Sequence, residues 1–247
     1  MMQIPSISGG KDSTAMLLMM IERGEPIHSV VFFDTGWEFP QMYDHIDLLE
    51  KRTGIKIWRL HSRLPFDYWM TARPIIVRTG PNKGKLYKIG NGWPSPSRRW
   101  CTRNKVDTID YYCKPIKDVV QCVGYAADET DRTLSNPKFQ YRFPLQEWGV
   151  TEADALQYCY DKGYCWGGLY DYFHRVSCFC CPLQRLNELR TLRRHFPDLW
   201  QRMLEMDKAI PVNRGFDGDK TVYDLELRFA DEDRQQDLFS SGPVYSS

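Results

Sequence analysis

The chain has 247 residues, of which 42% are apolar and 26% charged, and its formal net charge is +1. This composition is typical of a globular protein with one large domain and an extension, and it argues against disordered and collagen-like classes. The mean hydropathy is −0.53, and no apolar run approaches the roughly 20 residues of a membrane span. Residues 1–5 show no basic segment followed by an apolar stretch, so we expect no signal peptide, no membrane partner and a cytoplasmic protein.

The N-terminal part of the chain alternates between strand and helix patterns. The run at 29–33 is almost continuously apolar, which is typical of a strand buried on both faces of a parallel sheet. Similar runs predict strands over 4–7, 55–60 and 119–123, and helical patterns are found over 14–23 and 41–52. The alternation predicts an α/β fold, a doubly wound, Rossmann-like parallel sheet, in a domain over residues 1–145.

The C-terminal part changes to helical patterns. Thr151 to Asp154 resembles a capping box, and residues 183–195 and 198–208 have helical patterns separated by Pro197. We therefore expect a helical, cysteine-bearing extension over residues 146–213. Residues 214–247 are acidic with few apolar side chains, and we expect this tail to be partly loose.

Charge is concentrated in two segments. Residues 73–105 hold nine Lys or Arg and no Asp or Glu, whereas residues 217–237 hold eight acidic and three basic residues. The simplest interpretation of both runs is a solvated surface. The basic segment also carries aromatic residues, four prolines and four glycines within 73–100, which predicts a long irregular loop. Such a loop suits contacts with the phosphates and bases of a nucleic acid.

A phosphate-binding loop is predicted where the first strand meets the first helix. The sequence there is Ser8-Gly9-Gly10-Lys11-Asp12-Ser13. Two glycines permit a close backbone approach, the helix N-terminus presents N–H groups, and Lys11 adds a positive charge. The spacing of a Walker A loop is absent, so this is another kind of phosphate loop.

Residues 8–13 resemble the PP-loop of the ATP pyrophosphatase (adenine nucleotide alpha hydrolase-like) superfamily. Three later segments resemble its phosphoadenosine phosphosulfate (PAPS) reductase branch: residues 33–43, residues 123–132 with Ala126 where an arginine is common, and residues 143–158. The resemblance implies an ATP site, with Mg²⁺, at the carboxyl ends of the strands. It assigns cofactor contacts to Ser8, Gly9, Gly10, Lys11, Asp12, Ser13, Phe33, Asp34, Thr35, Gly124 and Arg132, and catalytic roles to Lys11, Asp12 and Ser13.

Eight cysteines raise the question of metal binding. Cys178 and Cys181 have the C-x-x-C spacing of zinc and iron–sulfur ligands, and Pro182 follows them. Their segment and the one around Cys101 have counterparts in PAPS reductase-like proteins, which implies a [4Fe–4S] cluster on Cys101, Cys178 and Cys181, with zinc as the alternative. The fourth ligand stays open between Cys180, Cys165, Cys159 and a non-protein ligand. We expect Cys113, Cys122 and Cys159 to be core residues.

The resemblance leaves three functions open. A sulfonucleotide reductase of this branch uses a thiol in a C-terminal motif, and no cysteine follows Cys181 in these residues. We therefore favour an ATP pyrophosphatase that adenylates an acceptor, similar to the enzymes of DNA phosphorothioation and tRNA thiolation. Its expected partners are a nucleic-acid acceptor and a sulfur-donor protein such as a cysteine desulfurase. The alternatives are an APS or PAPS reductase that uses a partner's thiol, and a non-catalytic nucleotide-binding subunit. An oligomer is compatible with each.

Overall fold

The computed structural model describes residues 1–129 and 138–240. The chain divides into two compact units, each built from two separate stretches of sequence. The first unit comprises residues 1–66 and 100–181, and the second comprises residues 67–99 and 182–247. The boundaries at 145 and 213 stay predictions; in this division residues 67–99 group with residues 182–247.

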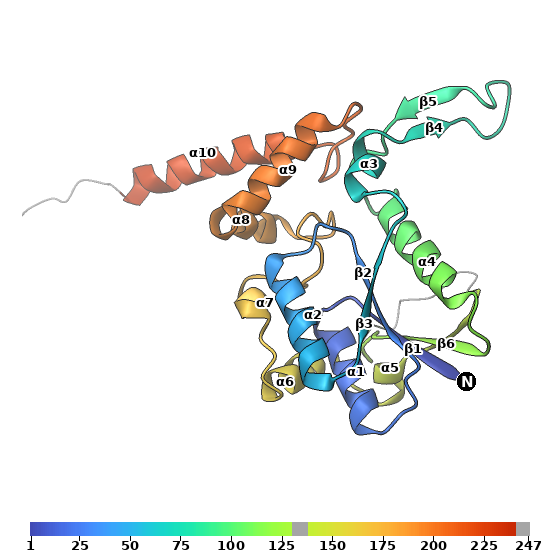
Figure 1. The fold of residues 1–247 in the computed structure, drawn as a ribbon. Helices are drawn as coiled ribbons and strands as arrows, with labels where there is room; N and C mark the ends of the chain where they lie inside the picture. Colours follow the sequence, from blue (N-terminus) through green and yellow to red (C-terminus); the bar gives the residue numbers. More distant parts are fainter. Residues whose placement is uncertain (130–137, 241–247) are drawn as a thin grey trace, which may run out of the picture. The chain divides into compact units, whose positions relative to one another are not determined.

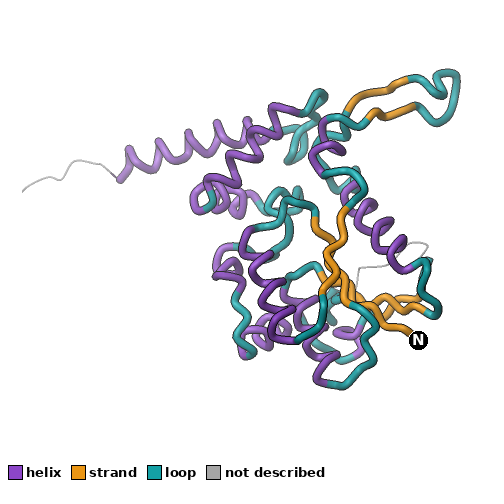
Figure 2. The backbone as a smooth tube through the Cα atoms, viewed as in Figure 1, coloured by secondary structure: helices purple, strands orange, loops and turns teal. Residues whose placement is uncertain are grey.

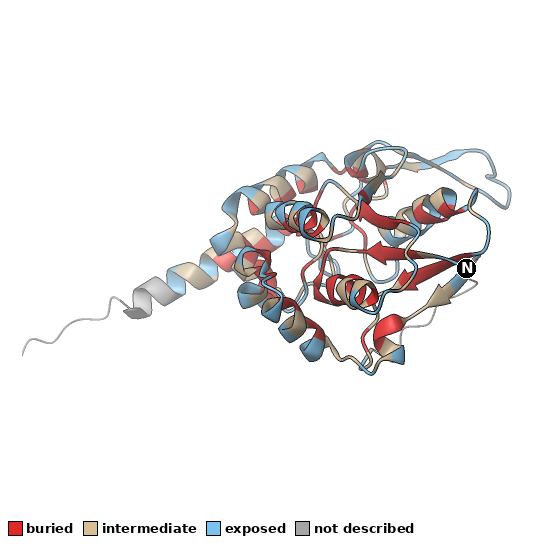
Figure 3. Cartoon of the chain, turned by 60° about the horizontal axis from the view of Figure 1, so that its bottom comes forward, coloured by how far each residue is buried: buried red, intermediate tan, exposed pale blue. Residues whose placement is uncertain are grey.

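The first unit contains a five-stranded sheet in the order β3-β2-β1-β6-β7. Every neighbouring pair of its strands is parallel, as the buried apolar runs predict. The sheet is visible between the helices in Figure 2, and Figure 3 shows that its central strands are buried. Its strands are β1 (Met2–Ile7), β2 (Val30–Asp34), β3 (Ile57–His61), β6 (Val119–Val123) and β7 (Gln140–Arg142).

Helices lie on both faces of this sheet (Figure 1). On one face α4 covers an apolar core that includes Val31, Phe33 and Ile109. The helices of the unit are α1 (Lys11–Glu22), α2 (Pro40–Thr53), α4 (Trp100–Cys113), α5 (Pro144–Glu147), α6 (Glu152–Asp161), the 3₁₀ turn η1 (Trp166–Gly168) and α7 (Leu169–Tyr172). The prediction of a doubly wound, Rossmann-like α/β fold is confirmed. The Thr151–Asp154 capping box also forms, at the start of α6.

The second unit contains two antiparallel strands and three long helices, and it differs from the sequence prediction in two places. The segment at 73–100, expected to be irregular, forms a β4–β5 hairpin. The tail, expected to be loose, forms α10 over residues 222–240. The elements are β4 (Pro74–Ile76), β5 (Leu86–Ile89), α8 (Leu186–His195), α9 (Pro197–Ala209) and α10 (Val222–Ser240), while α3 (Phe66–Thr71) begins at the boundary between the units.

The acidic run of α10 is ordered by arginines of α8. Arg193 pairs with Glu226 at 2.8 Å and with Asp233 at 2.5 Å, and Arg190 pairs with Glu232 at 2.6 Å. Between these contacts, Trp200 packs on Phe229. The acidic residues are therefore largely engaged inside their own unit, which is why a segment with few apolar side chains still forms a helix.

Within the described ranges, no helix is both long and apolar enough to cross a membrane. All eight cysteines are free thiols, and Cys113, Cys122 and Cys159 are buried as predicted.

Candidate functional site

The predicted phosphate loop lies at the carboxyl ends of the central strands. The chain runs outward from β1 to β2 and β3, then returns to place β6 and β7 on the other side of β1. The order therefore reverses between β1 and β6. In open α/β sheets, ligands bind in the crevice outside the strand carboxyl ends at such a reversal. The loop after β1, the segment after β2 and Gly124 after β6 all lie at this edge.

The two loop glycines are required by close neighbours. Gly9 has a φ of +81°, and a Cβ there would lie 2.8 Å from Cε of Met42. A Cβ on Gly10 would lie 3.2 Å from the Tyr170 hydroxyl and 3.2 Å from the carbonyl of Val176. In the part of the chain that the structure describes, the N–H groups of Gly9, Gly10 and Asp12 form no hydrogen bond with the protein. These N–H groups precede or begin α1, where an anion is favoured.

Two serines close the loop on itself. The Ser8 N–H donates to Oγ of Ser13 at 3.1 Å, and the Ser13 hydroxyl donates to the Gly10 carbonyl at 3.0 Å. The Ser13 side chain is buried. Ser13 therefore holds the shape of the loop, in addition to any contact with a phosphate.

Lys11 is held by two carboxylates. Its Nζ lies 3.1 Å from Oδ1 of Asp12 and 2.6 Å from Oε2 of Glu152 at the start of α6. The Lys11 side chain is only 8% exposed, so this charge is confined to the loop. Burial raises the pKa of Asp12 despite the attraction of Lys11. For Glu152, the hydrogen bond and charge of Lys11 outweigh the effect of burial and lower its pKa.

The η1–α7 segment supports the loop from outside the sheet. The Lys11 N–H donates to the Tyr170 hydroxyl at 2.7 Å, and the Trp166 indole donates to the Gly9 carbonyl at 2.7 Å. The Trp166 ring also stacks on His45, which bonds the Thr14 hydroxyl at 2.9 Å. Burial lowers the pKa of His45 to about 4, so this histidine is neutral near pH 7 and serves packing. The sequence contains no local signal for these contacts.

Gly124 allows β6 to approach the first turn of α1. Its φ is ordinary, but a Cβ would lie 2.8 Å from Cα of Ser13 and 2.9 Å from the Ser13 N. These are backbone atoms, which cannot rotate away. Gly124 therefore helps to set the position of the loop, and its contact with a nucleotide stays a prediction.

The segment after β2 forms its own hydrogen-bonded turn. Oδ1 of Asp34 accepts from the Gly36 N–H at 2.7 Å and from the Tyr43 hydroxyl at 2.8 Å. The Thr35 hydroxyl donates to Oε1 of Glu38 at 2.9 Å. The Phe33 side chain is packed in the core beneath α4, so only its backbone is available to a ligand at the sheet edge.

Four cysteines meet at the next turn. Glu38 pairs with Cys178 in an antiparallel bridge, and the Phe179 N–H donates to the Trp37 carbonyl at 2.9 Å. This pairing brings Cys178, Cys180 and Cys181 to the end of β2. Cys178, Cys180 and Cys181 influence one another's pKa values, and Cys101 on α4 influences the pKa of Cys180. Cys101, Cys178 and Cys181, the three predicted metal ligands, and Cys180, one of the candidates for the fourth, therefore lie in one region of the first unit.

The buried carboxyl of Glu38 and the half-buried amine of Lys105 lie near these thiols. Burial raises the pKa of Glu38 to about 7 and lowers that of Lys105, which lies four residues after Cys101 on α4. Hydrogen bonding from Cys180 and burial raise the pKa of Cys178, and burial raises that of Cys101. Such thiols are protonated near pH 7 unless a metal binds them. Among the described residues, no three His, Cys, Asp or Glu side chains are arranged to hold a metal ion.

The structure places most of the predicted site residues at one edge. Residues 8–13, Asp34, Thr35 and Gly124 lie there, while Arg132 is outside the described residues. Sequence reasoning missed Glu152, Tyr170, Trp166, Glu38 and Lys105. Of these, only Lys105 had a local signal, because residues four apart share one face of a helix.

Comparison with known proteins identifies related sequences. The family model of the phosphoadenosine phosphosulfate reductase domain matches residues 3–184. An uncharacterized 37.8 kDa protein of Escherichia phage 186 is 43% identical over 84% of this chain and 75% of its own length. Two uncharacterized proteins of Methanocaldococcus jannaschii are 25% and 24% identical, over 80% and 88% of this chain. The chain spans only 39% and 49% of the length of these two archaeal relatives.

A solved structure is also similar. The phosphoadenylyl-sulfate (PAPS) reductase of Candida auris, determined as a phosphate complex, superposes with a TM-score of 0.47 at 16% identity. The match covers 68% of this chain and 76% of that chain.

Proposed function

Because the chain belongs to the phosphoadenosine phosphosulfate reductase domain family, we propose that it binds ATP at residues 8–13 and adenylates an acceptor with release of pyrophosphate. The observation that carries the proposal is the loop itself. Among the described residues, the N–H groups of Gly9, Gly10 and Asp12 have no protein partner, and they lie with the buried Lys11 at the N-terminus of α1. This arrangement suits a polyphosphate whose charge grows as the leaving group departs.

In the proposed reaction, an acceptor oxygen attacks the α-phosphorus of ATP. The bond from the α-phosphorus to the bridging oxygen breaks, and that oxygen leaves with pyrophosphate. The loop N–H groups and Lys11 hold the phosphates throughout, and Asp12 is the residue that would help to position an accompanying Mg²⁺, since this ion prefers carboxylate and phosphate oxygens. A sulfur nucleophile then attacks the adenylated centre, and AMP leaves.

We propose nucleic acid as the acceptor and a cysteine desulfurase as the sulfur source. The basic segment at 73–105 supports the first assignment, because its sequence holds nine Lys or Arg and no Asp or Glu, and cations favour contact with a polyanion. The free state of all eight thiols is compatible with action in the reducing cytoplasm.

We propose an iron–sulfur cluster on Cys101, Cys178 and Cys181, with Cys180 as a candidate fourth ligand, because thiolates are the usual protein ligands of [4Fe–4S] clusters. The donor type supports the proposal, while the described side chains are not arranged to hold a metal ion. When bound through three cysteines, such a cluster would leave one iron open, which would be able to carry sulfide. Zinc would be bound by the same thiolates, but it would stabilise the fold and take no part in sulfur transfer.

Anaerobically purified protein is expected to contain iron and sulfide and to absorb broadly near ~400 nm. Cys178→Ser should lose this absorption. Cys122→Ser is the matched control, because Cys122 is buried elsewhere, donates to the Gln3 side chain at 3.3 Å, and a hydroxyl can replace that hydrogen bond. Iron and sulfide analysis of the three proteins is the measurement. Colourless wild-type protein with bound zinc would contradict the cluster and favour the structural metal.

Pyrophosphate release is the test of the proposed activity. We expect release from ATP that rises when nucleic acid is added. The family description supports a second candidate, reduction of a sulfonucleotide with a thiol from a partner protein. That function predicts sulfite release from PAPS in the presence of a dithiol protein, without pyrophosphate release from ATP. Nucleotide binding with neither product would identify a non-catalytic subunit.

A further inference from the structure

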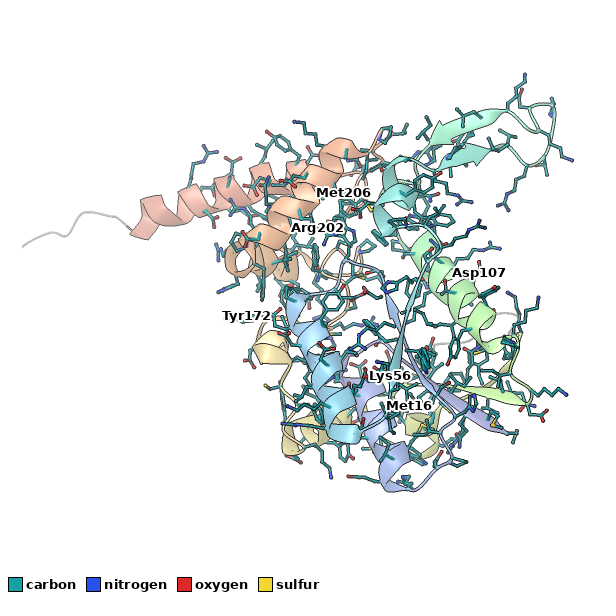
Figure 4. The ribbon with its side chains drawn as sticks, viewed as in Figure 1. Met16, Lys56, Asp107, Tyr172, Arg202 and Met206 are labelled. Atoms are coloured by element: carbon teal, nitrogen blue, oxygen red, sulfur yellow. The ribbon has the colours of Figure 1, made fainter. Side chains whose placement is uncertain are left out.

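The β4–β5 hairpin of the second unit presents a basic tip. Residues 78–87 are all exposed, and the tip carries Arg78, Lys83 and Lys85. In Figure 4 the side chains of this hairpin project outward on both sides of the ribbon. The Gly84 N–H donates to the Val77 carbonyl at 2.9 Å, and the Val77 N–H donates to the Lys85 carbonyl at 3.0 Å. These backbone contacts close the hairpin, so the charges stand on an ordered scaffold.

A second group of cations lies at the base of the hairpin. Lys88 is on β5, Arg98 follows the Ser95 turn and Arg214 follows α9, yet the three are close enough to interact. Burial, then the charges of Arg214 and Arg98, lower the pKa of Lys88. Mutual repulsion of this kind is unfavourable without an anion between the cations.

The cations of the hairpin and its base lack carboxylate partners. Within residues 1–129 and 138–240, no ion pair involves Arg78, Lys83, Lys85, Lys88, Arg98 or Arg214. The acidic side chains of α10 in the same unit are instead paired with Arg190, Arg193 and Arg194. The second unit therefore keeps one group of charges neutralised and leaves the other available to a polyanion.

A β-bulge shapes the same surface. Ile76 pairs with Leu86 and Ile75 with Lys88, so Tyr87 is the extra residue in the ladder. Bulges redirect side chains, and the Tyr87 hydroxyl accepts a hydrogen bond from Arg214 at 3.0 Å. Tyr87 is also the one aromatic residue between 74 and 89. Single-stranded nucleic acid is usually held by several stacking aromatic side chains, and this hairpin does not supply them.

We propose that the β4–β5 hairpin, with Lys88, Arg98 and Arg214 at its base, is a docking surface for duplex DNA. A two-stranded β-ribbon fits the major groove of B-form DNA, whereas the deep, narrow major groove of duplex RNA does not admit it. The cations contact phosphates, and the exposed Ile76, Leu86 and Ile89 lie on the ribbon beside the bases. The inference rests on the proposed function, which makes the acceptor a nucleic acid. It adds that this nucleic acid is duplex DNA and that the hairpin is the surface that contacts it.

The test measures binding of the full chain to a labelled duplex DNA by fluorescence anisotropy across a salt series. The variant is Lys83→Gln with Lys85→Gln, at exposed positions where loss of the fold is not expected. The matched control is Arg228→Gln with Arg234→Gln, which removes the same charge from α10, where both arginines are ion-paired. Circular dichroism confirms that all three proteins are folded.

The tip variant should make the fall of log K, the association constant, with log salt concentration less steep by about two. This change is equivalent to about 50-fold weaker binding at about 0.1 M salt. The control should bind like wild type. Equal binding by the tip variant and wild type would overturn the proposal. So would tighter binding of single-stranded DNA or duplex RNA, binding to anionic lipid vesicles but not to DNA, or a dimer that only the tip variant loses.

Failure of the docking surface and failure of the proposed activity give different results. Binding that depends on the tip, without pyrophosphate release, would support the docking surface and contradict the adenylating function. Pyrophosphate release with unchanged binding by the tip variant would support the adenylating function and contradict the docking surface.

Discussion

Replacing Lys11 with glutamine is expected to reduce pyrophosphate release by about 10²–10³-fold, the usual effect of removing one preorganised charge donor from a transition state. Lys11 is the cation of the loop, its side chain is 8% exposed, and it lies between Asp12 and Glu152. Glutamine retains length and hydrogen bonding but not charge. The measurement is the initial rate of pyrophosphate release at saturating ATP and nucleic acid.

The substitution also leaves two carboxylates without their cation, so a lower rate could reflect a weakened fold. The double variant Lys11→Gln with Glu152→Gln separates the two effects, because it removes one of the repelling charges. It should recover thermal stability while the rate stays low. Lys56→Gln is the control for loss of charge, since Lys56 is 63% exposed and pairs with Glu50 on the surface. A double variant that recovers both stability and rate would contradict a role for Lys11 in phosphate transfer.

Replacing Gly124 with alanine is expected to destabilise the protein by about 1–3 kcal/mol, as overpacking generally does, and to abolish nucleotide binding. The new Cβ would lie 2.8 Å from Cα of Ser13 and 3.0 Å from the carbonyl carbon of Asp12. Relief requires β6 and the first turn of α1 to separate, which distorts the loop. Thermal unfolding and ATP binding by calorimetry measure the two effects.

Gly24→Ala is the matched control for this change. Gly24 lies beyond the other end of α1 with a φ of +65° and no neighbour within 4 Å of a built Cβ. Alanine at this position would clash with no neighbour, and the strain of its left-handed backbone would lower the free energy of unfolding by about 1–2 kcal/mol. The two variants should lose similar stability, but the Gly24 variant should still bind ATP. Wild-type affinity in Gly124→Ala would show that the loop does not depend on its contact with β6.

The fold of the first unit followed from local patterns. The strands β1, β2 and β6 are rich in apolar residues, and each predicted strand overlaps an observed one. The loop at Ser8–Ser13 was also visible, because glycines, a cation and a strand–helix junction are adjacent in sequence. Short-range signals sufficed because a parallel strand must be apolar on both faces.

The second unit was predicted less well, for a physical reason. Both β4 and β5 are short and largely exposed, so neither shows the apolar alternation by which strands are recognised. The α10 helix is polar, and it is ordered by arginines about 30 to 40 residues away on α8. Charge composition by itself suggested a loose tail, whereas its partners made it a helix.

The sequence by itself determined the family, the parallel sheet and the identity of the loop and cysteine motifs, because each depends on residues close together in the chain. Only the tertiary structure decided what surrounds them. Lys11 meets Glu152 from 141 residues away, and the backbone of Glu38 pairs with that of Cys178 from the far end of the first unit's sequence. Such contacts arise when separate elements pack on one sheet, and no local pattern specifies which distant side chain will complete a charge or a ligand set.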